Sequence, residues 1–290
     1  MRAGPLSTNE VIETLNRYFV PVASSNYDTD DTGSAPRAEK VERQRIYGDF
    51  LRQKLGAGDV HVYIVRPDGT SLRGIDIGNA LVEGKLAAFL EDVRKELRTP
   101  AGPPAFPPHP ASVAPPAAPD ALVFHLVARS DNVGRGGWHA FPSENWIVLS
   151  HAEWTGLLPP EPVVDRNNVW KASSAVAAKL MSGFYPQTEE LTPGPRSRVD
   201  QAELRMTVTT LQNGVARARI EGSVKLMHSF YPMKPHDDFA ESKVIGFMDF
   251  LPREGRIQRL RLVTEQAEYV DHPFTVTLRS VSQETLDSQK

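Results

Sequence analysis

The chain has 290 residues, of which 40% are hydrophobic and 24% are charged. These proportions are typical of a soluble globular protein and exclude a collagen-like chain, a coiled coil and wholesale disorder. The formal net charge is -3, and neither half of the chain has a basic excess, so no nucleic-acid partner is expected. Cysteine is absent, which excludes thiol nucleophiles, disulfides and thiolate metal sites.

No membrane span is expected, because no run in the sequence reaches the roughly 18 apolar residues that crossing a bilayer requires. The first ten residues, MRAGPLSTNE, lack the apolar core of a signal peptide. As written, the sequence therefore indicates a cytoplasmic protein. If the natural protein begins further upstream, a periplasmic or secreted protein is expected instead.

The first domain is predicted to alternate helices and strands. The apolar residues after Ser7 recur with helical spacing, and Glu10 follows three residues later, as in a capping box. In chain order, the predicted elements are a helix over 8–18, a strand over 19–23, a helix over 38–55, strands over 60–65 and 72–77, and a helix over 80–97.

This order of elements resembles the thioredoxin-like family, in particular bacterial members in which an LNxxFVPV segment follows a redox motif. The stretches that carry the resemblance are NEVIETLNRYFVPV at 9–22 and VHVYIVRPDGTSL at 60–72. The resemblance implies an α/β thioredoxin-like domain over 1–98. The family's CxxC motif has no counterpart here, and no proline stands near Val60, where the family places a cis-proline. We therefore expect a redox-inactive domain; the alternative is a redox protein whose thiols lie upstream of this chain.

A proline-rich stretch follows this domain. Nine of the twenty residues over 100–119 are proline. Proline lacks the backbone N–H and fixes φ, so this stretch can join neither a helix interior nor a central strand. We expect an extended linker over 99–119, although the same composition is also typical of ligands for proline-recognition modules.

The second domain, over 120–290, is predicted to be an α+β unit dominated by antiparallel sheet, in the form of a twisted sheet or a partial barrel. Its hairpin signals are Gln212-Asn213-Gly214 and Pro252-Arg253-Glu254-Gly255. The predicted strands are 122–128, 146–149, 204–211, 215–227, 244–251, 256–264 and 274–281. The predicted helices are 151–157, capped by Ser150, and a longer one that starts at Asp165 or Asn167 and ends at Gly183.

The second domain is also similar to an uncharacterised region that accompanies thioredoxin-like domains in some exported bacterial proteins. The stretches that carry this similarity are KLMHSFYP at 225–232, VIGF at 244–247 and LRLVT at 260–264. The similarity implies no activity.

Four tryptophans are concentrated in this domain: Trp138, Trp146, Trp154 and Trp170. Large aromatic rings close together can form a stacking surface for a ligand. The alternative is a small hydrophobic core filled by these rings. Both interpretations follow from the clustering alone.

Imidazoles and carboxylates are concentrated between two predicted strands, and these groups suit a divalent transition metal. The candidate ligands are His228, His236, Asp237 and Asp238, with His272 on a neighbouring strand. The alternative is a long connection with solvated polar side chains.

Together, these patterns predict a non-catalytic binding or interaction protein that needs no cofactor, with a protein or a small molecule as its partner. Two alternatives remain. One is a metal-dependent enzyme that uses the segment 228–238, and the other is a thioredoxin-like redox protein truncated upstream of its CxxC.

Overall fold

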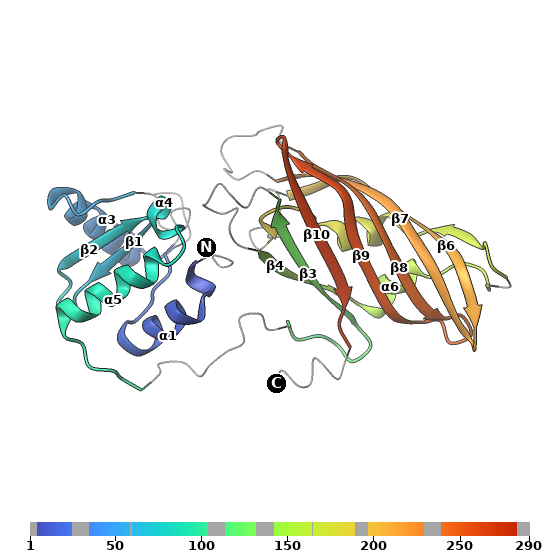
Figure 1. Cartoon of the computed structure of the whole chain (residues 1–290), viewed down its shortest axis with the longest axis horizontal. Coiled ribbons are helices and arrows are strands. Elements are labelled where there is room, and N and C mark those ends of the chain that lie inside the picture. The colour runs from blue at the N-terminus through green and yellow to red at the C-terminus, as the bar shows by residue number, and fades with distance from the viewer. Residues whose placement is uncertain are drawn as a thin grey trace. The chain divides into compact units, whose positions relative to one another are not determined.

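The structure is a computed structural model of the chain (Figure 1). It describes residues 5–24, 35–58, 60–103, 114–131, 142–163, 165–188, 197–228 and 239–282. These residues divide into two units, unit 1 within 5–103 and unit 2 within 114–282. In the described ranges, no helix is both long and apolar enough to span a bilayer.

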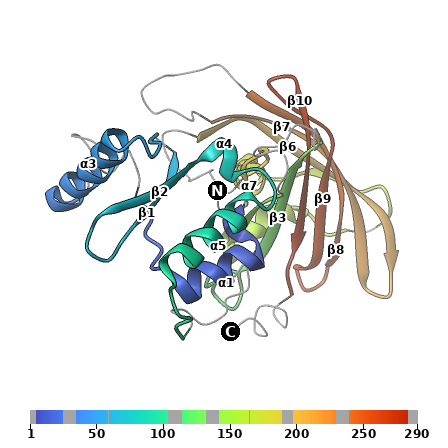
Figure 2. The same cartoon turned by 60° about the vertical axis from the view of Figure 1, so that its left-hand side comes forward.

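Unit 1 packs helices against a two-stranded antiparallel sheet. Its elements are η1 (Pro5–Ser7), α1 (Asn9–Tyr18), α3 (Arg37–Arg52), β1 (His61–Val65), β2 (Ser71–Asp76), α4 (Ile77–Ala80) and α5 (Lys85–Leu97). Helices α1 and α5 lie side by side (Figure 2). The core is formed by Val11 of α1, Ile64 and Leu72 of the sheet, and Leu90 and Val93 of α5.

Two predicted elements of unit 1 are wrong in detail. The stretch 19–23 forms no strand, and Val20 and Val22 are 87% and 85% exposed. A strand needs a neighbouring strand to pair with, and among the described residues β1 and β2 pair only with each other. The helix predicted over 80–97 begins only at Lys85, as α5. The chain turns just before it at Gly84, whose φ of 73° lies in the left-handed region. Neither result tests the thioredoxin-like assignment of 1–98, which stays a prediction.

Unit 2 is built on an eight-stranded antiparallel sheet, which confirms the predicted antiparallel sheet, although only seven of its strands were predicted. Its strands are β3 (Leu122–Ser130), β4 (Ser143–Leu149), β5 (Val169–Lys171), β6 (Ser197–Gln212), β7 (Val215–His228), β8 (Phe239–Leu251), β9 (Arg256–Tyr269) and β10 (His272–Ser280). The strand order is β4-β3-β10-β9-β8-β7-β6-β5, with β4 and β5 at the two edges. Among the described residues, the two edges do not pair with each other, so these strands form an open sheet.

The sheet curves around a helix. Three short helical elements belong to unit 2: α6 (His151–Trp154), η4 (Thr155–Leu157) and α7 (Ser174–Met181). Helix α7 contacts both β6 and β4, which lie near opposite ends of the strand order. One helix can reach both strands only if the sheet is strongly curved, and Figure 1 shows this curvature in the long strands β6 to β10.

The short helix predicted after Ser150 is confirmed, with a capping box between Ser150 and Glu153. The longer helix predicted from Asp165 or Asn167 is wrong in its first part. Val169–Lys171 form the edge strand β5, and α7 begins only at Ser174. Trp170 is buried between two exposed neighbours, which is the period-two pattern of a strand with one buried face.

The two faces of this sheet differ in chemistry. Along β8, Ala240, Val244 and Met248 are buried, whereas Lys243 and Phe247 are exposed. We call the side that packs on the core with α7 the inner face and the opposite side the outer face. Among the described residues of unit 2, many outer-face side chains are exposed and could meet a partner from outside the unit.

Candidate functional site

Strand register aligns a row of cationic and aromatic side chains across the outer face of unit 2. Trp146 of β4 is opposite His125 of β3, and His125 is opposite Arg279 of β10. Arg279 is opposite Arg261 of β9, and Arg261 is opposite Phe247 of β8. Residues directly opposite each other in antiparallel strands have Cβ atoms about 5 Å apart. The five side chains therefore form one continuous row over five neighbouring strands.

A second row lies two residues along each strand and is mostly apolar. It consists of Val127 of β3, Thr277 of β10, Val263 of β9 and Ile245 of β8, which are register partners in that order. We call these four residues the apolar band. The two rows, without Trp146, line a shallow depression of about 510 Å³. We call the depression and Trp146 beside it the outer-face site.

Arg261 and Arg279 have no counter-charge among the described residues. Within the part of the chain that the structure describes, neither guanidinium has an ion pair or a side-chain hydrogen bond. By contrast, Arg217 on the same face pairs with Asp249, with 2.7 Å between Nε and Oδ1. Like charges directly opposite each other on a sheet destabilise it. The site therefore carries a local positive charge that an external anion would neutralise.

The aromatic end of the row is fixed in place by contacts within the sheet. The rings of His125 and Trp146 stack, with centroids 4.5 Å apart and an interplanar angle of 28°. Nε2 of His125 is 3.0 Å from Oε2 of Glu144. At the opposite end, Phe247 is 52% exposed. A flat or apolar ligand could cover the exposed ring of Phe247 without opening a cavity, and burial of this apolar surface would favour binding.

The three described tryptophans do not form a common surface. Trp146 is on the outer face. Trp154 and Trp170 are buried in the core of unit 2, where their indole N–H groups donate to the carbonyl oxygens of Asp120, at 2.8 Å, and Leu157, at 2.9 Å. This placement favours the core-filling alternative for those two. Trp138 lies outside the described residues.

The proposed metal ligands are only partly described. His228 ends β7, and His272 begins β10. Strands β8 and β9 lie between them, which separates the two backbones by about 14 Å along the sheet. His236, Asp237 and Asp238 lie outside the described residues. Among the residues that are described, no three histidine, aspartate or glutamate side chains are grouped to hold a metal ion, and a metal site in 228–238 stays a prediction.

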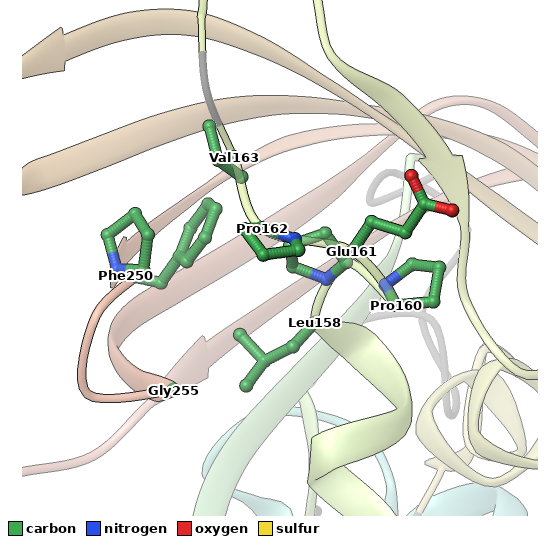
Figure 3. A pocket seen from close by; sticks show the side chains of 9 residues that line it. Leu158, Pro160, Glu161, Pro162, Val163, Phe250 and Gly255 are labelled. Atoms are coloured by element: carbon green, nitrogen blue, oxygen red, sulfur yellow. The ribbon is translucent and has the colours of Figure 1, made fainter.

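A second, smaller depression of about 240 Å³ lies where the loop after η4 meets the turn between β8 and β9. It is lined mainly by Leu158, Phe250 and the prolines at 159, 160 and 162. Figure 3 shows the carboxylate of Glu161 directed away from Leu158 and Phe250. No convergent polar groups line this depression, so we assign it to loop packing.

In unit 1, His61 is an unusual titratable group. Its Nδ1 and Nε2 atoms are buried and have no hydrogen-bond partner among the described residues. The ring stacks on Tyr63, with centroids 4.7 Å apart, and only the absence of a side chain at Gly74 leaves room for it. Burial lowers the pKa of His61, and the nearby carboxylate of Asp76 opposes this shift only in part.

We expect unit 1 to lose stability as the pH falls from 7 to 5. The unfolded chain binds a proton at His61 with the ordinary pKa of about 6.5, whereas the folded state resists protonation, so acid favours unfolding. Hydrogen exchange of β1 and β2, corrected for its intrinsic pH dependence, should show weaker protection at pH 5. His61→Phe keeps the aromatic ring and should remove the change. Equal pH dependence in both proteins would refute this account.

His125, Phe247, Arg261 and Arg279 were not predicted as site residues from the sequence. The one available signal was alternation, since Arg259-Leu260-Arg261-Leu262 places arginine on a single face of a strand. Alternation does not show which strands become neighbours, and that pairing assembles the site.

Comparisons with known proteins returned no similarity to describe: no family model, no curated protein and no solved structure matches this chain.

Proposed function

We propose that the chain is a non-catalytic binding protein, and that the outer-face site binds an anionic ligand. The observation that carries the proposal is the pair Arg261 and Arg279, directly opposite each other and without a carboxylate partner among the described residues. Guanidinium groups present planar N–H donors that match carboxylate and phosphate oxygens two at a time. An anion across the pair would form charge-assisted hydrogen bonds and remove the repulsion between the two cations.

The surroundings of the pair support a small organic ligand. The volume of the depression, about 510 Å³, is within the range of about 300–1,000 Å³ that is usual for small-molecule sites. Phe247 borders Arg261, and His125 borders Arg279. The anion would thus be held between two aromatic rings, which favours a ligand that also has an apolar part.

The alternatives from the sequence have no comparable support. A metal-dependent enzyme would use the segment 228–238, whose side chains lie outside the described residues. A redox protein would need thiols upstream of this chain, since cysteine is absent from it. We therefore propose a binding role together with a redox-inactive unit 1.

Phenyl phosphate is a suitable probe, because it combines an anion with an aromatic ring. We expect Arg261→Gln and Arg279→Gln each to weaken its binding about tenfold or more, the size expected for losing a charged hydrogen bond. Isothermal titration calorimetry of the full chain would measure this loss. Neither substitution should lower the melting temperature, since each removes a repulsion between like charges.

Arg256→Gln is the matched control. Arg256 is also on β9, but its guanidinium pairs with Glu254, 2.9 Å away. This variant should bind phenyl phosphate as the unmodified protein does. The proposal fails if the unmodified protein does not bind the probe, or if all three variants lose binding equally.

A further inference from the structure

We infer that the ligand of the outer-face site is a monomeric amphiphile, a single hydrocarbon chain that ends in a carboxylate or a phosphate. This inference rests on the proposed anion binding and adds the class of molecule that carries the anion. It is carried by the shape of the apolar band and by the position of the two arginines beside it.

The apolar band is long and narrow. Val127, Thr277, Val263 and Ile245 cross four neighbouring strands, a span of about 14 Å at the usual strand spacing. Along the strands, the band is one residue wide on the outer face. The row of Arg261 and Arg279 borders one side, and polar residues, Arg129, Thr275 and Lys243, border the other.

This outline fits one extended alkyl chain. Successive outer-face residues of a strand are about 6.6 Å apart, which leaves room for one hydrocarbon chain between the two polar borders. A broad ring system or a protein surface would instead cover charged side chains on both sides, at a desolvation cost. The guanidiniums beside the middle of the band can hold the head group while the chain covers Val263 and its neighbours.

The charges on the outer face favour a free amphiphile over an anionic membrane surface. Binding to such a surface depends on several unpaired basic residues in one cluster. Here acidic side chains, Glu144, Glu221 and Asp249, lie on the same face, and Asp249 neutralises Arg217. Arg129, Lys243 and Arg259 on this face also have no ion pair among the described residues. Of these cations, only Arg261 and Arg279 are directly opposite each other, and this pair matches one small head group.

The test is a titration of the full chain with acetate, hexanoate and decanoate, each kept below the concentration at which micelles form. A fully buried methylene raises an affinity about fourfold, so we expect about twofold per methylene on this half-open surface. Decanol, which has the chain but no anion, should bind at least about tenfold more weakly than decanoate.

Val263→Ser should reduce the gain in affinity per methylene, because it removes part of the apolar band. Val169→Ser is the matched control, since Val169 is also exposed on unit 2 but lies on the edge strand β5, away from the band. It should bind all three carboxylates as the unmodified protein does.

The outcomes separate this inference from the proposed function. If the three carboxylates bind with equal affinity, the inference is overturned and anion binding stands. If none binds, anion binding itself is overturned. Binding to phosphatidylglycerol vesicles without binding of monomeric decanoate would overturn the inference in favour of a membrane surface. If Arg261→Gln binds decanoate as tightly as the unmodified protein does, the anion is not recognised and both proposals are overturned.

Discussion

Replacement of Gly246 by alanine is expected to destabilise unit 2 by about 3 kcal/mol, at the upper end of the usual cost of overpacking. Gly246 is buried in the middle of β8, and a Cβ atom there would overlap the carbonyl oxygen of Arg261 on β9. Gly222 of β7 has the same relation to the carbonyl oxygen of Glu203 on β6. The backbones approach so closely that a methyl group forces the strands apart.

Gly246→Ala is also expected to alter the outer-face site, because Gly246 lines the depression together with residues of both rows. A shift of β8 relative to β9 would move Phe247 and Ile245 away from Arg261. We therefore expect Gly246→Ala to weaken phenyl phosphate binding as well as stability.

Chemical denaturation followed by tryptophan fluorescence would measure the effect, since Trp146, Trp154 and Trp170 all belong to unit 2. Ser242→Ala is the matched control on the same strand and the same buried face. The hydroxyl of Ser242 is buried without a hydrogen-bond partner among the described residues, so its removal should leave stability unchanged or slightly higher. Equal midpoints for Gly246→Ala and the unmodified protein would show that β8 and β9 do not approach too closely for a methyl group at this position.

Trp170→Ala is expected to cost about 3–5 kcal/mol, the usual range for deleting a large buried aromatic side chain. Trp170 is buried against the core of unit 2, where its ring meets Phe250 edge-on with centroids 5.8 Å apart. Its Nε1–H donates to the carbonyl of Leu157. Truncation would leave both a cavity and an unsatisfied buried carbonyl.

Trp146→Ala should lower the stability of unit 2 much less than Trp170→Ala. Trp146 is only half-buried, on the outer face, and its truncation removes the stacking with His125, worth about 1 kcal/mol. Denaturation midpoints compared with phenyl phosphate affinities would separate the two roles. If Trp146→Ala is as destabilising as Trp170→Ala, or if Trp170→Ala folds normally and loses only binding, the assignment of these tryptophans is wrong.

The sequence predicted most of unit 2 because its signals are local. In the hairpin between β6 and β7, Asn213 and Gly214 have φ values of 53° and 79°, as the Asn-Gly turn signal requires. The long alternating strands follow from the same period of two. The errors occur where contacts with distant strands determine the secondary structure. Val169–Lys171 pair with β6 and therefore form a strand, not a helix. The stretch 19–23 has no strand to pair with and stays irregular.

The candidate site could not be predicted in the same way. Its central pair joins β9 to β10, which are adjacent in the sequence, but His125 is on β3, more than a hundred residues earlier. Alternation shows that Arg261 and Arg279 face outward, whereas only the register shows that they face each other. Proximity in the sequence also suggested a surface shared by the tryptophans. In the structure, Trp146 lies on the outer face, whereas Trp154 and Trp170 lie in the core.

The most direct test of anion binding is nuclear magnetic resonance of the arginine side chains during a titration with phenyl phosphate. The account predicts that the Nε–Hε signals of Arg261 and Arg279 shift together and saturate. The signal of Arg217, held by Asp249, should stay in place. A titration in which Arg261 and Arg279 do not shift, or shift no more than Arg217, would contradict the assignment of this face as the binding site.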